Sequence, residues 1–495
     1  MKLCRIVYMR LLCAVVLCLS LASFPVCAEG VASDVVMQAA VDRFASHPSL
    51  RHGSVSVCVM RLGEGDVVAG HAIDEACITA STMKTVTSAT ALDLLGRDFT
   101  FGTQAVAIGH IDHHGTLKGD LVVRGGGDPT LGSRYFAGRG AIIDSIVASL
   151  HCHGVKHIDG RVVIDNSAIP YPPVGNCWMH DDLGYDYGAG CFGLCFADNV
   201  LQVTAGRSGS EVTDFSVTPP SMQMVIKNRI QLYDNKEDME VSHVEAVPDY
   251  DTPALTLWGG ALRSDKPLEM TFANPAPYHT FEDSLLRALH RAEIKVRNHK
   301  KKSGRDEAVP DTLLLLDFRS PALPEVLSSL LYRSDNMYTE MTLRAIAALD
   351  GKPATIKNGI ARVHELWTAK GVDCTPLFMR DGSGLSRNNK ASARFLCHLL
   401  RSVEADSAAL GCDFAQLLPV GGVSGTLQSL LGKTPLKGRV ALKSGSMSDV
   451  QCFAGYYPAE NPEYAVAVLV NNFVCPRSEL LSNIEKLFVE LFAAE

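Results

Sequence analysis

Ser81 and Lys84 form the single Ser-x-x-Lys pair in this chain of 495 residues. A serine hydroxyl is a weak nucleophile at its ordinary pKa and needs a base held against it. On a helix, residues three apart share a face, so the Lys84 amine would lie beside the Ser81 oxygen. A chain of this length contains about one Ser-x-x-Lys by chance, so the pair alone is a weak indication of catalysis.

Ser334-Asp335-Asn336 is a second group with chemical potential. It falls in a short break between two segments with helical periodicity, 325–332 and 337–348. A hydroxyl and an amide at such a junction are suited to relaying a proton to a leaving amine and to binding a substrate carbonyl. The alternative is an ordinary helix cap, because Ser, Asp and Asn all cap well. Ser386-Arg387-Asn388 repeats the pattern, so it is not unique.

Lys443-Ser444-Gly445-Ser446, at the end of a predicted strand, is the third group. Lys443 would contribute positive potential, Ser444 would bind a carboxylate, and Gly445 would let a substrate backbone approach closely. The backbone N–H of Ser446, with that of Ser81, would form an oxyanion hole. Lys302-Ser303-Gly304 reads the same but lies in a charged run without a strand pattern, which favours a loop.

Elements from both ends of the chain must position these groups. Apolar periodicity predicts a strand over 54–60, a return strand at 67–69, and a helix from Ser81 to Leu95 that Gly96 ends. Three strands over 439–446, 451–457 and 464–473 and a helix over 478–492 follow at the far end. These strands would complete one sheet, with the two ends of the chain packed together. The region 100–300 is rich in strands and turns, and helices are predicted again after Pro310.

The order Ser-x-x-Lys, Ser-x-Asn, Lys-Ser/Thr-Gly is that of penicillin-binding proteins and class A β-lactamases. Ser81 and Ser334 are 253 positions apart, more than a β-lactamase domain accommodates. The chain resembles the low-molecular-mass class C penicillin-binding proteins, the D-Ala-D-Ala carboxypeptidase/endopeptidase family. Further matching segments are 119–131, Asp181-Asp182 with 187–189, 381–387, 418–420 and 425–427. The departures are Ser444, where threonine is usual, and a high cysteine content.

The resemblance implies a role for each motif residue. Ser81 would form an acyl-enzyme with the penultimate D-Ala carbonyl, and Lys84, as a neutral amine, would take its proton. Ser334 would pass a proton to the departing amine and Asn336 would position the substrate. Lys443 with Ser444 would hold the terminal carboxylate, beside Gly445 and Ser446. Asp181 or Asp182 is expected to contact the diamino-acid side chain of the stem peptide.

The expected fold is an α/β (α+β) catalytic domain of the β-lactamase/transpeptidase type. It would have an antiparallel sheet with helices on both faces, plus two inserted β-rich domains. The expected division is a signal peptide over 1–28 and a catalytic domain over 29–98 and 308–495. An inserted domain would span 99–166 and 268–307, with a second domain nested at 167–267. The expected partners are peptidoglycan stem peptides, with β-lactams as covalent inhibitors, and no cofactor is expected.

Composition and the N-terminus indicate an exported globular protein. Hydrophobic residues make up 47% of the chain and charged residues 20%. A basic start and an apolar run ending in Val26-Cys27-Ala28 predict a signal peptide cleaved after Ala28 and a periplasmic or envelope location. The alternatives are a membrane anchor and a lipoprotein. Removing the signal changes the net charge from −8 to −11, which argues against a nucleic-acid partner, and no later segment is long and apolar enough to span a membrane.

Eleven of the 15 cysteines follow the predicted signal peptide. An odd number in an exported protein requires at least one free thiol or an intermolecular bond. Cys191 and Cys195 are close enough to pair, whereas Cys58, Cys397 and Cys452 have the pattern of small core residues. No cysteine pair has zinc-finger spacing and the histidines lie in turn-rich stretches, so no metal site is expected.

Two alternative functions are compatible with these motifs. A β-lactamase or esterase would use the same three groups on another substrate. A non-catalytic peptidoglycan-binding scaffold would depend on the large insertion instead.

Overall fold

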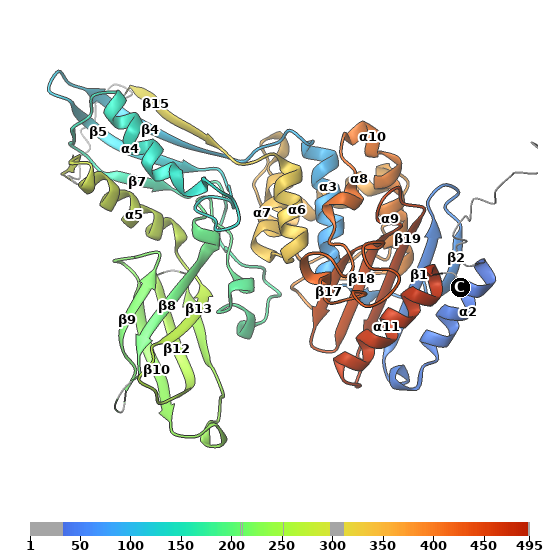
Figure 1. Ribbon diagram of the computed structural model, residues 1–495. Helices are drawn as coiled ribbons and strands as arrows, with labels where there is room; N and C mark the ends of the chain where they lie inside the picture. The colour runs from blue at the N-terminus through green and yellow to red at the C-terminus, as the bar shows by residue number, and fades with distance from the viewer. Residues whose placement is uncertain (1–32, 208, 210, 251, 298–310, 494–495) are drawn as a thin grey trace, which may run out of the picture.

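The computed structural model describes residues 33–493 except 208, 210, 251 and 298–310. The predicted signal peptide and Lys302-Ser303-Gly304 therefore lie outside the described residues. Figure 1 shows two groups of elements side by side, one from the two ends of the chain and one from its middle.

Strands from both ends of the chain form one five-stranded antiparallel sheet, as predicted. Its order is β17 (Ala441–Met447), β18 (Val450–Tyr457), β19 (Tyr464–Asn471), β1 (Ser54–Arg61) and β2 (Val67–His71). The first described helix, α2 (Asp34–Ala45), packs against the last, α11 (Arg477–Phe492). An ion pair of 2.9 Å between Arg43 and Glu490 joins the two helices. The prediction that the two ends meet is confirmed.

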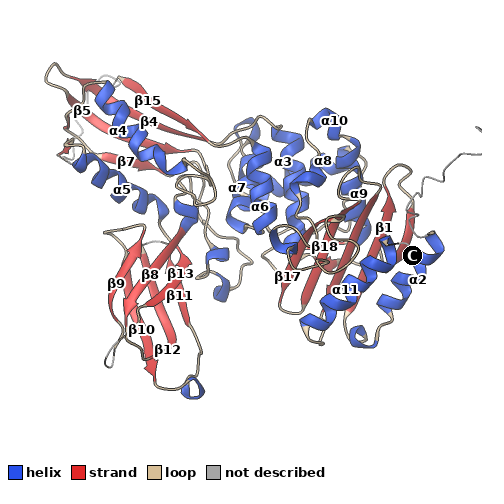
Figure 2. Ribbon diagram, viewed as in Figure 1, coloured by secondary structure: helices blue, strands red, loops and turns tan. Residues whose placement is uncertain are grey.

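Helices cover both faces of this sheet (Figures 1 and 2). Successive residues of a strand point to opposite faces. Val57 and Val59 of β1 share one core with α2 and α11, whereas Cys58 and Met60 share the other core with α3 and α9. All residues of β18 and β19 are buried, because each strand is covered on both sides. The predicted fold class is confirmed.

The helix that follows Ser81, α3 (Met83–Leu95), runs through the middle of one helical layer and is followed by Gly96, as predicted. Its neighbours are α6 (Leu323–Arg333), α7 (Asn336–Ala347), α8 (Ile356–Ala369) and α9 (Ala393–Ala405). Every residue from Met83 to Leu92 is buried, including the polar ones. The helix therefore carries Lys84 into the protein interior rather than along a surface.

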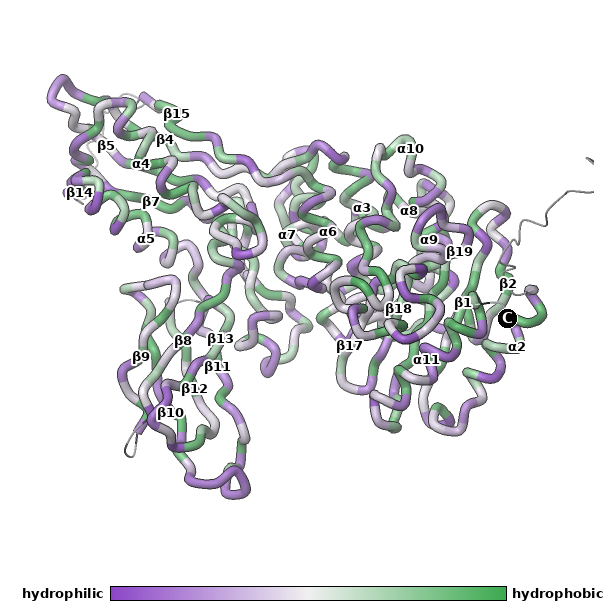
Figure 3. Tube along the Cα trace, in the orientation of Figure 1, coloured by the Kyte–Doolittle hydropathy of each residue, from purple (hydrophilic) through white to green (hydrophobic). Residues whose placement is uncertain are grey.

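The middle of the chain forms three further sheets. The largest has the order β14 (Lys295–Val296), β6 (His157–Ile158), β5 (Thr116–Gly125), β4 (Gly102–Ile111) and β15 (Thr312–Arg319), with β7 (Val162–Asp165) beside β5. Helices α4 (Ile142–Cys152) and α5 (Pro277–Arg291) contribute to its core. The tip of the β4–β5 hairpin, at the upper left in Figure 3, is hydrophilic.

Two three-stranded sheets share a second core within the insertion. One has the order β13 (Leu268–Ala273), β8 (Val200–Gly206), β9 (Thr213–Thr218), and the other β10 (Val225–Tyr233), β12 (Ala254–Leu262), β11 (Val244–Asp249). The remaining described helix and strands are α10 (Ser407–Leu410), β3 (Cys77–Ile78) and β16 (Lys390–Ala391).

The structure differs from the predicted organisation at two positions. Helices were expected after Pro310, within the catalytic range 308–495, but β15 pairs with β4 of the inserted sheet. The run Leu313 to Leu316 is short and apolar, which fits a strand as well as a buried helix. β13 lies beyond the expected nested range 167–267, yet it pairs with β8. We propose that the catalytic part resumes after Arg319 and that the nested part extends to Ala273.

None of the helices in the described part of the chain is long and apolar enough to cross a membrane. Within the same ranges, no group of three or more His, Cys, Asp or Glu side chains is arranged to hold a metal ion. The described cysteines are all free thiols, including Cys191 and Cys195. Cys58, Cys397 and Cys452 are buried in the core, as predicted.

Candidate active site

Ser81 and Lys84 meet at the start of α3. Ser81 lies in a 3-10 turn, Ala80–Thr82, and Lys84 lies in the first turn of the helix. The Nζ of Lys84 is 3.0 Å from the Oγ of Ser81. It also contacts Oδ1 of Asn336 at 2.5 Å and the carbonyl oxygen of Ser383 at 2.7 Å. A buried amine thus faces the candidate nucleophile.

Burial determines the charge of Lys84. Its side chain is 0% exposed. Burial lowers its pKa to about 8, although the carboxylates of Asp335, Asp381 and Glu340 act in the opposite direction. The neutral amine that a general base requires therefore exists close to neutral pH.

Ser334 occupies the break between α6 and α7 in an unusual backbone conformation. Its φ is 60° and its ψ is 40°, in the left-handed region that residues other than glycine adopt rarely. The helix cap is supplied by the next residue, because the Asp335 carboxylate accepts the N–H of Tyr338 at 3.0 Å. Capping is therefore the role of Asp335, and the Ser334 hydroxyl is left for other contacts.

Lys443 links the third motif to the second. Its side chain is fully buried, and its Nζ donates to the Oγ of Ser334 at 3.0 Å and to the carbonyl of Ser444 at 2.6 Å. Burial, and then the nearby charge of Lys84, hold the pKa of Lys443 well below its usual range. The hydroxyl of Ser444 shares a hydrogen bond of 2.6 Å with that of Thr426.

Gly445 lies where β17 passes the turn that carries Ser81. A Cβ at this position would lie 2.7 Å from the carbonyl oxygen of Thr79, 2.9 Å from the backbone nitrogen of Thr82 and 3.0 Å from that of Ser81. The expected reason for this glycine was a close substrate backbone. The contact that requires it here is with the backbone of the protein itself.

Arg477, the first residue of α11, holds the turn between β17 and β18. Its guanidinium donates to the hydroxyl of Ser446 and to the carbonyl oxygens of Met447 and Val450. It therefore brings a charged group next to Ser446.

The segment 381–387 forms a tight loop around the buried carboxylate of Asp381. This carboxylate accepts the N–H groups of Gly384 at 2.8 Å and Ser386 at 2.7 Å and the side-chain amide of Asn389 at 2.7 Å. It also accepts the indole N–H of Trp178, from the insertion, at 2.9 Å. Ser386, which repeats the Ser-x-Asn pattern, thus belongs to this loop and not to the cluster around Ser81.

Two cavities have Ser81, Ser334 and Ser446 in their walls. One, of about 300 Å³, is also lined by Asp182, Tyr187, Asn336, Leu385, Arg387, Met447 and Ser448. The other, of about 510 Å³, extends past Thr426 and Ser444 to Arg477 and α11. Asp182 therefore lies at the site, where its carboxylate accepts the hydroxyl of Tyr187 at 3.2 Å. Asp181 lines neither cavity, and its side chain is 79% exposed.

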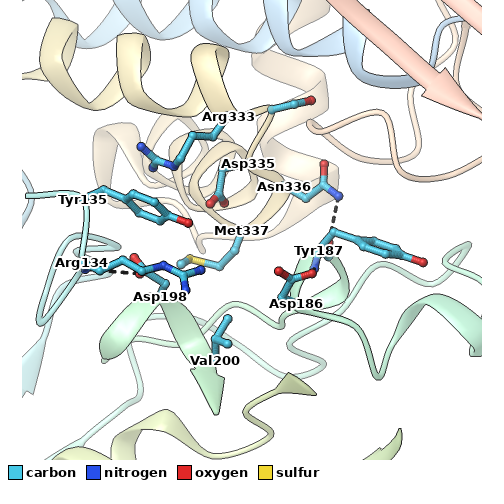
Figure 4. A pocket seen from close by; sticks show the side chains of 11 residues that line it. Arg134, Tyr135, Asp186, Tyr187, Asp198, Val200, Arg333, Asp335, Asn336 and Met337 are labelled. Atoms are coloured by element: carbon cyan, nitrogen blue, oxygen red, sulfur yellow. Dashed lines mark hydrogen bonds and ion pairs between the residues drawn. The ribbon is translucent and has the colours of Figure 1, made fainter. Parts of the chain in front are cut away.

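A third cavity of about 130 Å³ lies on the far side of Asn336, where the insertion meets the junction of α6 and α7 (Figure 4). The Nδ2 of Asn336 donates to the backbone carbonyl of Tyr187 at 2.8 Å. The guanidinium of Arg333 lies over the ring of Tyr135, 3.6 Å from its centre. The Tyr338 hydroxyl donates to Asp198 at 3.0 Å. The insertion thus supports the segment that carries Ser334 and Asn336.

The fold and the cluster define a class of protein. Penicillin-recognising serine peptidases combine four features on one chain. They have an α/β scaffold, a serine with an adjacent buried lysine, a second serine bonded to a second lysine, and a strand beside the nucleophile. Comparison with known proteins agrees with this class. The model of the D-Ala-D-Ala carboxypeptidase 3 (S13) family matches residues 37–494.

Relatives are similar along most of their length. The D-alanyl-D-alanine carboxypeptidase of Actinomadura sp. (strain R39) is 27% identical over 466 residues, covering 88% of this chain and 81% of its own. The D-alanyl-D-alanine carboxypeptidase DacB of Haemophilus influenzae is 25% identical over 431 residues, covering 85% and 86%. The crystal structure of penicillin binding protein 4 (dacB) from H. influenzae superposes with a TM-score of 0.77 at 24% identity, covering 92% of this chain and 99% of that one. That protein has also been solved in complex with a novel β-lactam.

The chain belongs to the D-Ala-D-Ala carboxypeptidase 3 (S13) family. The resemblance stated from its motifs is confirmed, and the protein is a serine D-Ala-D-Ala carboxypeptidase.

Proposed function

We propose that the protein removes the terminal D-Ala of peptidoglycan stem peptides through an acyl-enzyme on Ser81. The observation that carries this proposal is the 3.0 Å contact between the Ser81 hydroxyl and the buried Lys84 amine. The Ser81 oxygen attacks the penultimate D-Ala carbonyl while its proton moves to neutral Lys84. The backbone N–H groups of Ser81 and Ser446 stabilise the developing oxyanion.

Ser334 completes the acylation step. The C–N bond breaks, and the proton that Lys84 took from Ser81 passes to the departing D-Ala amine through the Ser334 hydroxyl, which Lys443 holds in place at 3.0 Å. Asn336 positions the substrate amide. Water then attacks the Ser81 ester, releases the shortened peptide and returns the proton to Ser81. A β-lactam acylates Ser81 in the same way and leaves slowly.

The terminal carboxylate is held by Ser444 and Arg477. Lys443 was expected to share this role, but its low pKa and its bonds to Ser334 and the carbonyl of Ser444 suit it better to orienting Ser334. Arg477 lines the same cavity as Ser81 and Ser444 and carries a permanent charge. Gly445 and Ser446 form the edge along which the substrate backbone lies.

Asp182 contacts the ammonium group of the diamino acid in the stem peptide, while Asp181 faces solvent. A D-Ala-diamino-acid cross-link would enter the same cavity, so the proposed activity includes endopeptidase action. The basic and apolar N-terminal 28 residues support export to the periplasm or cell envelope. The proposed catalytic part comprises 29–98 and 320–495, with the insertion between.

The test is to label the purified protein with fluorescent penicillin, map the adduct by mass spectrometry and assay release of D-Ala from a D-Ala-D-Ala pentapeptide. We expect a stable adduct on Ser81, D-Ala release, and loss of both in Ser81→Ala. Ser88→Ala is a matched control, because the buried Ser88 hydroxyl on α3 has no hydrogen-bond partner among the described residues. An adduct on another residue would contradict the mechanism, and rapid turnover of the β-lactam without D-Ala release would indicate a β-lactamase. A Ser81→Ala protein that retained its cellular role would indicate a scaffold.

A further inference from the structure

The three contacts of Lys84 Nζ limit where its lone pair can point. A neutral amine has two N–H groups and one lone pair. Asn336 Oδ1 and the Ser383 carbonyl oxygen are acceptors only, so each takes one N–H. The lone pair is then left for the hydroxyl proton of Ser81. The direction of the base therefore depends on the placement of both acceptors.

Asn336 is fixed by its other amide atom. Its Nδ2 donates to the backbone carbonyl of Tyr187 at 2.8 Å, which requires Oδ1 to face Lys84. The Ser383 carbonyl belongs to a loop and needs a different support.

Glu340 provides that support. Its Oε1 accepts the backbone N–H of Gly382 at 2.9 Å and of Ser383 at 2.7 Å. The Thr87 hydroxyl, from α3, donates to the Gly382 carbonyl at 2.7 Å. The carboxylate thus clamps the two peptide units, 381–382 and 382–383, that lead up to the carbonyl on Lys84.

The position of Glu340 on α7 explains how one helix controls both acceptors. Asn336 and Glu340 are four residues apart, so they lie on the same face. One contacts Lys84 directly and the other contacts it through Ser383. Glu340 is 1% exposed, although an isolated buried carboxylate is costly. Nothing in the roles assigned to the three motifs requires a carboxylate at this place.

We propose that Glu340 is a positioning residue for Lys84: by holding the Gly382–Ser383 backbone it directs the lone pair of the base at Ser81. This inference rests on the proposed acylation of Ser81. Glu340 would join the three sequence motifs as a fourth part of the active site, one helical turn after Ser334-Asp335-Asn336.

Glu340 also contributes charge. Lys84 faces the carboxylates of Asp335, Asp381 and Glu340, and Lys443 lies in the same cluster. Burial and the neighbouring Asp381 raise the pKa of Glu340, whereas the hydrogen bonds from Ser383 and the charge of Arg344 act in the opposite direction. In its ionised form the Glu340 carboxylate helps to keep Lys84 protonated. Removing that charge makes the neutral amine available at lower pH.

The test compares Glu340→Gln with Glu340→Ala by measuring the rate of penicillin acylation from pH 6 to 10. Glutamine keeps an oxygen for the two N–H groups, so its maximal rate should stay within about threefold of wild type, with the rising limb moved to lower pH. Glu340→Ala should shift the rising limb of the pH–rate profile to lower pH in the same way. It should also lower the maximal rate by about 10- to 100-fold, because the lone pair of Lys84 no longer points at Ser81. Glu404→Gln replaces a partly buried carboxylate on α9, one oxygen of which has no hydrogen-bond partner among the residues that the structure describes. It should change neither the maximal rate nor the position of the rising limb.

Distinct outcomes separate this inference from the proposed function. If wild type is not acylated on Ser81, the proposed function fails. If wild type is acylated but both Glu340 variants keep its maximal rate and its pH midpoint, the inference alone fails. Equal losses in both variants without a shift of the midpoint would assign Glu340 a purely structural role. Should Glu340→Ala not fold, Glu340→Asp, which withdraws the carboxylate from the two N–H groups by one methylene, takes its place in the comparison of maximal rates.

Discussion

Replacing Gly445 with alanine tests the close packing of β17 on the nucleophile turn. The added Cβ would meet three backbone atoms of residues 79–82 at 2.7 to 3.0 Å, about 0.4 to 0.7 Å inside the 3.4 Å at which ordinary contacts begin. No side chain can move aside, so the strand and the turn must separate by roughly that amount. A misplacement of this order at a reacting group lowers the rate by up to about 100-fold, and overpacking costs about 1–3 kcal/mol of stability.

The assay is the rate of acylation by fluorescent penicillin together with the thermal midpoint. Gly432→Ala is the matched control, because a Cβ there would meet its neighbours at 3.6 Å or more. We expect Gly445→Ala to acylate up to about 100 times more slowly and the control to match wild type. Acylation of Gly445→Ala at the wild-type rate would refute the argument that β17 sets the position of Ser81.

Three further outcomes are expected. Penicillin acylation should rise with pH with a midpoint near pH 8, because burial lowers the pKa of Lys84 to about 8 and the base is the form that has lost its proton; a midpoint near that of an ordinary lysine would contradict this. Arg477→Ala should lower kcat/KM for a peptide ending in free D-Ala-D-Ala by about 10- to 100-fold and affect its C-terminal amide less, whereas equal losses would indicate a role only in the β17–β18 turn. Asp182→Asn should lower kcat/KM for a stem peptide with a free side-chain amine by about tenfold but not for its acetylated form. Asp181→Asn should behave as wild type, because its side chain faces solvent.

Much of the catalytic sheet could be predicted, because its strands are short apolar runs between clear turns. β1, β18 and β19 were located within two residues of their bounds, and Gly96 ended the helix after Ser81 as expected. The proximity of the three motifs came from family resemblance, since no local pattern can relate positions 253 residues apart.

Other features depend on tertiary contacts and were missed. β15 was not predicted, since only helices were expected after Pro310; its four consecutive leucines have neither helical nor strand periodicity, and the pairing with β4 makes this segment a strand. Asp181 and Asp182 are adjacent in sequence and could not be told apart without the cavity. Arg477 lies outside every motif in sequence, and its proposed role follows only from its hydrogen bonds to the β17–β18 turn and its place in the cavity wall. Glu340 could have been recognised from the sequence, because it lies one helical turn after Asn336 and so on the same face of the predicted helix.

The bonds from the insertion to the catalytic part have an evolutionary and practical consequence. Trp178 donates to Asp381 and the Tyr187 carbonyl accepts from Asn336. Residues of the insertion therefore complete the wall of the active site. A shortened protein that joined residue 98 directly to residue 320 would remove one of the four donors to the buried Asp381 carboxylate and the acceptor of the Asn336 amide. The insertion therefore cannot be deleted as an independent unit. A minimal enzyme made from the catalytic part would need new residues to replace those two partners.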